Sequence, residues 1–583
     1  MSLRSRLALG LTVLTVALAT PLVAAAVPSE PANRSAVSAP QAPGDPARLT
    51  LIVPLTVPPN ETGLLDADTL TRYTAPLGLL TRQLDALVDA PVAIGLDPLI
   101  AASIRVLGTS APPSALAWLA RLEAASNEIF ALAYADADVS AAASTGSLGL
   151  LAPIGLDFAV DPANFGEAQT ASPTPTPTPT PDDGAAPPLP TLQDLLAWPY
   201  TLENVAWPAD DTLDSGAVEA LGSAGYESVI LASTNVSDPG PTTNLGNITG
   251  VVSDAPISAL VRAATHAASE LELQTALDAL DASLVAFAAA SPGGELVATL
   301  DRDWPFLSYH LGDVIARLSA SPSVVFGTLA ATIARPTTSA TVIDHPEEGG
   351  RLSVIESALN GVAAEDRFAT VLTDPLLITA PRRLELLALL AVSWLPDPDG
   401  WAASSANFLA RSSEIVTSVR ITHGSDLVLL SRSTEVRVAV SNSLPHPVTV
   451  LVTIRPQRPL IRVIENQVLL EIEPDATKTA FIPVEAIANG VVTIQVAITS
   501  PTGVPVDSGF VRARLQAEWE TVGTVVVVVI IALIFGLGIA RTIVKRRRAK
   551  NAVAESAVAE TSAVEGPAPE STAPEASGER TGG

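Results

Sequence analysis

Hydrophobic and polar positions in the first half of the chain alternate between strand-like and helix-like patterns. Leu49–Leu55 is an apolar run of strand length that ends before Pro58-Pro59. Asp68 can cap a helix after it, because apolar residues then recur at spacings of three and four. These residues are Leu70, Tyr73, Leu77, Leu80, Leu84 and Leu87. The pattern therefore predicts a strand followed by one amphipathic helix.

The alternation of strand and helix continues to about Pro336. Apolar runs predict strands at 91–96, 128–134, 202–207, 228–232 and 296–300, and amphipathic patterns predict helices at 115–126, 215–222, 257–268 and 274–289. At least five βα-like units of this kind are typical of a parallel sheet covered by helices. We expect residues 49–340 to form a barrel or partial (β/α) barrel of the type found in sugar enzymes.

A segment rich in threonine and proline interrupts the alternation at 161–190. Its centre, residues 172–181, reads SPTPTPTPTP. Alternating Thr-Pro favours extended polyproline II and cannot pack a core. We therefore expect an exposed loop inserted into the barrel-like domain.

The pattern changes twice after the barrel-like domain. Residues 341–413 are mostly helical and are expected to pack on the barrel or to bridge it to the next part. From Val416 the period switches to two, with strands predicted at 435–440, 448–454, 468–472, 479–484 and 491–498. Short strands separated by turn signals predict an immunoglobulin-like β-sandwich at 414–518. The fold class is thus multidomain, α/β followed by all-β.

The N-terminal segment has the features of a secretory signal peptide. Arg4 and Arg6 precede an apolar run from Leu7 to Ala19, and Ala24-Ala25-Ala26 provides small residues for cleavage. We assign residues 1–26 to the signal peptide, with an uncleaved N-terminal anchor as the alternative, and residues 27–48 to a flexible leader rich in Pro, Ser and Ala.

A second apolar segment, Val522–Ala540, contains 19 residues without a charge. At 1.5 Å per residue it spans about 28 Å, close to the thickness of the hydrocarbon layer. A cluster of Arg and Lys follows between 541 and 550, which fits a membrane span better than a buried strand or a nucleic-acid patch. We expect a transmembrane helix at 521–543, a disordered cytoplasmic tail at 544–583, and a large extracytoplasmic portion of a single-pass type I protein.

Composition excludes several function classes. The 583 residues include no cysteine, which rules out disulfides, thiol catalysis and Cys-ligated metals. The formal net charge is −28, from 61 acidic and 33 basic residues, which argues against nucleic acid as the main partner. Five scattered histidines form no His-x-x-x-His pair, and no G-x-S-x-G, Walker or Rossmann motif is present. We therefore expect no metal and no cofactor.

Aspartates follow several of the predicted strands, where the reactive groups of a βα barrel lie. Paired carboxylates are what glycoside hydrolysis requires, and aromatic rings can stack on sugars. The candidates for catalysis are Asp136, Asp138, Asp210 and Asp211, and those for ligand binding are Asp97, Tyr134, Trp207, Asp301, Asp303 and Trp304. An aspartate after a strand is also a common helix cap or turn residue, a role that suits Asp97 before Pro98 and the pair Asp210-Asp211.

Four segments carry a resemblance to a known family. They are 118–141 (WLARLEAASNEIFALAYADADVSA), 205–233 (VAWPADDTLDSGAVEALGSAGYESVILAS), 444–456 (LPHPVTVLVTIRP) and 483–506 (PVEAIANGVVTIQVAITSPTGVPV). With their order along the chain, they resemble the actinobacterial domain-of-unknown-function family of large type I membrane proteins encoded beside the peptidoglycan lipid flippase. Residues 207–233 are also similar to the late βα unit of polysaccharide deacetylases and related glycoside hydrolases.

The first resemblance implies a location in the cell envelope rather than a chemistry, because that family has no established activity. Our main expectation is a non-catalytic surface protein, anchored in the lipid bilayer through 521–543, that binds cell-wall glycan or envelope-assembly proteins. The first alternative is an active glycoside hydrolase or transferase that uses the barrel aspartates. The second is a scaffold or signalling protein that works through its cytoplasmic tail.

Overall fold

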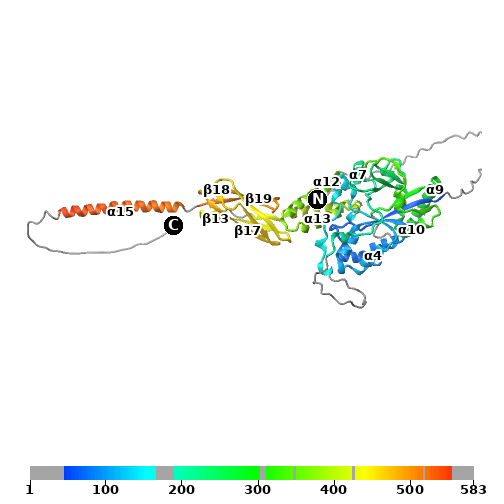
Figure 1. Ribbon diagram of the computed structural model, residues 1–583, viewed down its shortest axis with the longest axis horizontal. Coiled ribbons are helices and arrows are strands. Elements are labelled where there is room, and N and C mark those ends of the chain that lie inside the picture. The colour runs from blue at the N-terminus through cyan, green and yellow to red at the C-terminus, as the bar shows by residue number, and fades with distance from the viewer. Residues whose placement is uncertain are drawn as a thin grey trace, which may run out of the picture.

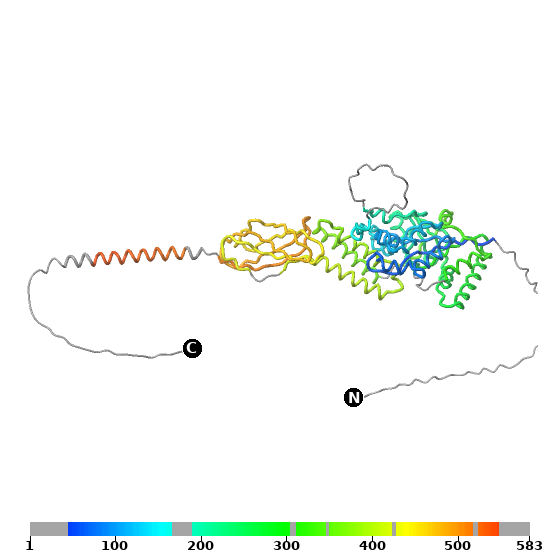
Figure 2. Tube along the Cα trace, turned by 90° about the horizontal axis from the view of Figure 1, so that it is seen from below, coloured from blue at the N-terminus to red at the C-terminus, as the bar shows by residue number. Residues whose placement is uncertain are grey.

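The computed structural model describes residues 45–165, 189–302, 310–345, 349–422, 427–516 and 519–553. Several expectations fall outside these residues: the signal peptide 1–26, nearly all of the leader 27–48, most of the insertion 161–190, Asp303, Trp304 and the tail beyond Val553. The described parts lie in a row, with an α/β unit at one end, then helices, then a β-sheet unit, then α15 (Figures 1 and 2).

The first sheet of the α/β unit is a half-barrel of parallel strands in the order β3-β2-β1-β8, with β9 also paired to β1. Its central strand β1 is buried on both faces, as expected of an apolar run in a parallel sheet. The strands are β1 (Ala47–Leu55), β2 (Val92–Leu96), β3 (Glu128–Ala131), β8 (Glu295–Thr299) and β9 (Val324–Phe326).

The second sheet has the order β10-β6-β7-β5-β4, in which β4, β5 and β7 are parallel and β6 is antiparallel to β7. Its strands are β4 (Val205–Ala206), β5 (Ser228–Ala232), β6 (Thr242–Asn244), β7 (Thr249–Ser253) and β10 (Thr338–Ser339). The two sheets meet at both margins, where Phe130 pairs with Leu202 and where Asp254 N donates to Val297 O at 2.8 Å. A small apolar core that includes Ile52, Phe130 and Trp207 therefore lies between them.

Helices of the α/β unit cover the outside of the two sheets and bury their apolar stripes against them. They are α1 (Ala67–Tyr73), α2 (Leu79–Leu87), α3 (Pro98–Val106), α4 (Pro113–Glu123), α5 (Val139–Ser144), α6 (Leu192–Leu196), α7 (Ser215–Ser223), α8 (Ala255–Thr265), α9 (Glu270–Ala290), α10 (Leu311–Ala320) and α11 (Leu329–Ile333). The structure thus alternates strands with helices over most of the unit, as the apolar periodicity predicts, but β6 and β7 form a hairpin, with no α-helix among the described residues 233–248 that separate β5 from β7.

The prediction of one helix capped by Asp68 is wrong, because the chain forms two helices, α1 and α2. Asp66 is the cap of α1 and accepts a hydrogen bond from Thr69 N at 2.6 Å. The break follows from Pro76 and from Gly78, where an added Cβ would lie 2.2 Å from Tyr73 O. The strand predicted at 128–134 also ends early, at Ala131, because Ala135 and Asp136 adopt positive φ in a tight turn.

Three helices connect the α/β unit to the β-sheet unit: α12 (Gly349–Phe368), α13 (Leu376–Leu389) and α14 (Pro398–Val416). On one side, Leu390 O, just after α13, accepts a hydrogen bond from Asp138 N at 2.8 Å. On the other side, Phe368 and Ile378 pack into the core of the β-sheet unit. The helices therefore share packing with both neighbours.

A buried charge network ties the three helices together. The Arg382 guanidinium on α13 donates to both carboxylate oxygens of Glu365 on α12 at 3.0 Å, and it also pairs with Glu385. It further donates to Phe408 O at 3.1 Å and to Ser412 Oγ at 2.8 Å on α14. Arg382 is 2% exposed and Glu365 is fully buried, so each charge depends on its partner.

Two sheets pack face to face in the β-sheet unit, in the orders β11-β13-β17-β15 and β12-β19-β18-β14-β16, and all their strand pairs are antiparallel except the parallel pair of β12 and β19. Alternate residues of their strands face a core of Val, Ile and Leu. The strands are β11 (Val419–Thr422), β12 (Leu427–Leu429), β13 (Ser433–Asn442), β14 (Val448–Pro456), β15 (Ile461–Val463), β16 (Gln467–Ile472), β17 (Thr477–Ala486), β18 (Gly490–Thr499) and β19 (Pro505–Leu515).

The last helix, α15 (Trp519–Val553), contains an apolar stretch, Gly523–Arg546, that could span a membrane. None of this stretch is buried against the rest of the protein, which fits a helix that lies in lipid. Helix α9 is also long enough to cross a membrane, but its mean hydropathy is 1.3 against 2.8, and Leu273, Leu277 and Leu280 bury one of its faces in the core of the α/β unit. We therefore interpret α9 as a core helix and α15 as the candidate span.

We expect Arg382→Ala to destabilise the helices, because it leaves Glu365 as a buried charge without its partner. The free energy of unfolding should fall by about 3 to 5 kcal/mol, measured by urea denaturation of the full chain. Arg432→Ala is the matched control, since Arg432 forms an exposed ion pair with Glu485 and should cost less than about 1 kcal/mol. Equal losses in the two variants would contradict the role of the network.

Candidate functional site

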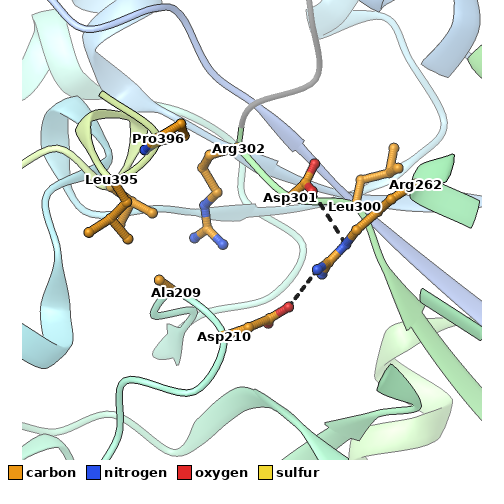
Figure 3. Close-up of a pocket in the computed structure, with 9 residues that line it drawn as sticks. Ala209, Asp210, Arg262, Leu300, Asp301, Arg302, Leu395 and Pro396 are labelled. Carbon is orange, nitrogen blue, oxygen red and sulfur yellow. Dashed lines mark ion pairs between the residues drawn. The ribbon is translucent and has the colours of Figure 1, made fainter. Parts of the chain in front are cut away.

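A pocket of about 240 Å³ lies at the carboxyl ends of the parallel strands, beside the segment that follows α13. Two arginines and two aspartates line it, with apolar side chains opposite them (Figure 3). The lining residues are Ala209, Asp210, Arg262, Leu300, Asp301, Arg302, Val392, Leu395 and Pro396. The candidates Asp210 and Asp301 are among them, so the structure brings these two together.

Arg302, three residues after the end of β8, forms a buried ion pair with the candidate Asp136. Arg302 Nε lies 3.2 Å from Asp136 Oδ2, and both side chains are 5% exposed. The guanidinium also donates to Trp207 O at 2.5 Å and lies over the Trp207 ring, 4.2 Å from its centre. One arginine therefore holds the ends of β3, β4 and β8 in place.

Arg262 on α8 holds the second group of carboxylates. Its Nη1 lies 2.7 Å from Asp210 Oδ2, and its Nε lies 3.7 Å from Asp301 Oδ2 (Figure 3). The same guanidinium donates to Thr299 O and Thr299 Oγ1 at 3.0 and 2.9 Å. His266 Nε2 lies 3.6 Å from Asp301 Oδ1. The two aspartates thus flank one arginine instead of facing each other across an open cleft.

Asp97 and Tyr134 are buried in the protein interior and do not line the pocket. Asp97 caps α3 by accepting from Leu99 N at 2.9 Å, and the same oxygen accepts from Ala135 N at 2.9 Å. The Tyr134 hydroxyl donates to Gly63 O at 2.8 Å, and the residue is 3% exposed. The Asp97 side chain orients the backbone after β2 and β3, and the Tyr134 side chain contacts the backbone after β1.

Asp138 and Asp211 are also engaged locally. Asp138 caps α5, where it accepts from Ser140 N at 3.0 Å, and it pairs with Arg351 of α12 at 2.9 Å. Asp211 adopts a positive φ of 56° and accepts from the Thr234 hydroxyl at 2.5 Å. The alternative role of a helix cap or turn residue, which the sequence offers for strand-end aspartates, therefore accounts for both.

Trp207 belongs to the small core between the two sheets. It is 4% exposed, and its ring centre lies 6.0 Å from that of Phe130. A sugar could stack on this ring only if Arg302 and the surrounding residues moved. Asp303 and Trp304, the remaining two candidates, lie outside the described residues.

Burial raises the pKa values of two carboxyls at this edge. Burial raises the pKa of Asp136 to about 6, although the Arg302 charge acts in the opposite direction. Burial also raises the pKa of Asp97 well above its usual range, and the neighbouring charge of Asp136 adds to this. Burial thus favours the protonated form of both carboxyls.

The arrangement is better suited to binding than to hydrolysis. Hydrolysis needs two carboxyl groups that reach the substrate, one of them as acid. Here Asp136 is covered by Arg302, and Asp210 and Asp301 are held by Arg262. Within the part of the chain that the structure describes, no group of three His, Asp or Glu could hold a metal ion.

Sequence reasoning missed the two arginines, which organise the site. Arg302 lies between Asp301 and Asp303, directly after the strand predicted at 296–300. This basic residue between two acidic ones is the sequence feature that could have indicated its role. Arg262 lies on a helix, and its reach to Asp210 depends on the packing of α8 against β8, which no local pattern encodes.

Comparison with known proteins gives one match over almost the whole chain. A sequence profile described as "Family of unknown function (DUF6049)" matches residues 6–570. No curated protein matches the chain. The family match therefore covers every described unit, and its description assigns no activity.

Similarity to solved structures is partial. The alpha-amylase AmyC from Thermotoga maritima is 9% identical, with 64% of this chain and 93% of that chain covered and a TM-score of 0.39. The alpha-2-macroglobulin of E. coli is 18% identical over 17% of this chain and 7% of that chain, with a TM-score of 0.15. SSP-19 of Caenorhabditis elegans is 12% identical over 16% of this chain and 94% of that chain, with a TM-score of 0.13. At these TM-scores none of the three establishes a function for this chain.

We expect Asp136→Asn to change how stability depends on pH. The folded protein holds the Asp136 proton up to a pKa of about 6, against an ordinary value of 3.8, so between pH 4 and 6 it binds more protons than the unfolded chain. This carboxyl therefore lowers the free energy of unfolding as the pH rises through that window, by about 3 kcal/mol in total.

The measurement is urea unfolding of the wild type and Asp136→Asn from pH 4 to pH 7. Relative to the variant, the wild type should lose stability as the pH rises, and any constant cost of leaving Arg302 without its partner should not alter this slope. Asp278→Asn, the same change in an exposed ion pair with Arg317, is the matched control. Parallel curves of stability against pH for wild type and Asp136→Asn would contradict a raised pKa of the Asp136 carboxyl.

Proposed function

The chain belongs to the DUF6049 family of unknown function, and from this premise we propose that it is a membrane-anchored cell-envelope protein that binds its ligand without cleaving it. In this proposal the two facing sheets act as one barrel of the sugar-enzyme type. The β-sheet unit is an immunoglobulin-like stalk, and α15 is the anchor.

The proposal rests on one observation: the carboxylates at the pocket are held by arginines. Arg302 pairs with Asp136, and Arg262 pairs with Asp210 and lies near Asp301. Because a guanidinium covers or holds each of these carboxyls, none of them reaches a substrate to transfer a proton unless its arginine moves away. The same fixed groups can still hydrogen-bond the hydroxyl groups of a bound molecule, because carboxylates keep further lone pairs for acceptance.

The pocket favours an uncharged polar ligand. Its lining contains two arginines and two aspartates, so their formal charges cancel. Leu395 and Pro396 offer apolar side chains beside Arg302, which suits the apolar face of a sugar ring (Figure 3). We therefore propose a neutral segment of envelope glycan as the ligand. The alternative partner that we propose is an envelope-assembly protein that inserts a polar loop into the pocket.

The proposed topology places the α/β unit outside the cell. The basic residues Arg541, Lys545 and Arg546 lie at the C-terminal end of the apolar stretch of α15, and such residues stay on the cytoplasmic side. The N-terminal segment 1–26 has the composition of a signal peptide, which supports export of the rest. An actinobacterial source and a link to lipid precursor export derive from the sequence resemblance alone.

One observation favours a second function, hydrolysis of envelope glycan. The pKa of Asp136 is raised to about 6, which is the direction that a general acid requires. For this role Arg302 would have to leave Asp136 when substrate binds. Release of reducing sugar ends from envelope glycan, abolished in Asp136→Asn, would favour this second function over the first.

We expect Asp210→Asn to weaken binding of neutral envelope oligosaccharides, because it removes the charge that positions Arg262 at the pocket. The loss should be about tenfold or more, as for a hydrogen bond to a charged group. Calorimetric titration of the full chain in nanodiscs measures it. Asp278→Asn changes an exposed carboxylate away from the pocket and should bind like the wild type; equal affinity of all three proteins would sink the assigned site.

We expect single cysteines to report the two sides of the membrane, since the chain has no cysteine of its own. Thr502→Cys, in the β-sheet unit, should react with a membrane-impermeant maleimide in intact cells. Ala552→Cys, beyond the span, should react only after the membrane is permeabilised. Labelling in the reverse order would contradict the proposed topology.

A further inference from the structure

The end of the β-sheet unit nearest α15 is apolar and exposed, and we propose that it rests on the surface of the lipid bilayer that α15 crosses. We call it the membrane-side end and define it by the loops 429–433, 456–464 and 485–491 together with the end of β19. The inference rests on the proposed membrane anchoring and adds a second contact with the same membrane.

Strand register places these loops at one end of the unit. Leu515, the last residue of β19, pairs with Gly490 at the start of β18 and with Leu429 at the end of β12. Ile487 N donates to Leu460 O at 2.8 Å, and Ala486 N donates to Arg432 O at 2.7 Å. The loops therefore form one continuous surface, and it is the surface from which the chain leaves toward α15.

Exposed apolar side chains gather at this end. Five of the eight large apolar side chains that the described part of the β-sheet unit exposes lie at or next to it: Val428 (57%), Leu430 (59%), Ile464 (62%), Ile487 (56%) and Val491 (50%). The other three, Leu469, Phe481 and Phe510, lie on the strands. Clusters of exposed apolar residues mark surfaces that another apolar phase covers.

The opposite end of the β-sheet unit shows the contrast. Its loops, 443–447, 473–476 and 500–504, expose no large apolar side chain. The helical segment packs against this end, where Phe368 and Val371 belong to the core of the β-sheet unit. Ser443 N in one of these loops also donates a hydrogen bond to Ser418 O, just after α14, at 3.0 Å. One end is thus covered by protein, whereas the membrane-side end has no cover within the described residues.

The connection to α15 is too short to hold this end far from the membrane. Residues 516–518 separate the end of β19 from the start of α15 at Trp519. Three residues span at most about 10 Å. The headgroup layer adds about 5 to 8 Å on each side of the hydrocarbon. Both views show α15 continuing from this end, on the side opposite the α/β unit (Figures 1 and 2).

Arginines at the same end suit the phosphates of lipid headgroups. Arg432 and Arg462 both lie near Glu485, at 3.2 and 3.5 Å, so this group of three keeps a net positive charge. Arginine matches a phosphate through two parallel hydrogen bonds. In the sequence, Glu518 of the connection and Glu520 of α15 offset this charge, so burial of the apolar side chains is the main attraction.

The test measures depth at single labelled cysteines in the full chain, reconstituted in phosphatidylcholine nanodiscs. A fluorophore at Ile487→Cys should be quenched several-fold more strongly by headgroup-nitroxide lipid than one at Thr502→Cys, at the opposite end. Equal and weak quenching at the two positions, in protein that co-migrates with nanodiscs, overturns the docking while leaving the anchor intact. Failure to co-migrate overturns the anchoring and the docking together.

A second pair of variants separates apolar contact from mere proximity. In the Ile487→Cys background, Ile464→Asp with Val491→Asp should reduce quenching to the level of Thr502→Cys. Leu469→Asp with Phe481→Asp, an equal change on the exposed strand faces, should leave it unchanged. Unchanged quenching in the first pair, or equal loss in both, overturns the proposed surface.

Discussion

Neutralisation of buried carboxylates by arginines is the constraint on which the pocket depends. Parallel strands bring their carboxyl ends to one edge, where Asp97, Asp136 and Asp301 follow β2, β3 and β8. Several acidic groups at one edge repel each other and lose hydration. The guanidinium groups of Arg262 and Arg302 compensate the charges of Asp210 and Asp136, and the N-termini of α3 and α5 donate hydrogen bonds to Asp97 and Asp138. These carboxylates therefore stabilise the fold through ion pairs and helix caps, and any role in ligand binding is additional to this.

The same logic extends along the molecule. Arg351 of α12 pairs with Asp138, so the helical segment shares a charge with the edge of the α/β unit. Arg382 then joins α12, α13 and α14, and Phe368 carries the packing into the β-sheet unit. A ligand in the pocket would thus contact a structure whose parts are joined by buried ion pairs and shared cores. Such coupling fits a protein that holds a binding surface at a fixed distance from its anchor.

Much of the architecture could be predicted from local patterns. Strand β5, predicted at 228–232, lies at those residues, because a short apolar run bounded by polar residues is the typical pattern of a buried strand. The apolar helix near the C-terminus is equally legible from its length. The hairpin of β6 and β7 was missed, because Thr and Asn dominate its first strand. Helix α3 was missed because its Pro98 start and small residues resemble a turn.

The candidate site was harder to predict than the fold. Strand ends point to aspartates, and Asp210 and Asp301 do line the pocket. Whether an aspartate is a cap, an ion-pair partner or a ligand group depends on what packs against it from distant elements. Arg302 reaches Asp136 across 166 positions of sequence, and Arg262 reaches Asp210 from a helix. Tyr134 and Trp207 were proposed as platforms because aromatic rings look alike in sequence, whereas burial separates core from surface.

Whether a bound glycan stays intact on the protein distinguishes binding from hydrolysis. The full chain would be incubated with a stoichiometric amount of neutral envelope oligosaccharide, and the masses of the bound and free sugars would be measured over time. Retention of one unaltered oligosaccharide on the protein is the result that this account predicts. Accumulation of shorter fragments, one of each pair heavier by a molecule of water, would show that the arginine-held aspartates perform hydrolysis after all.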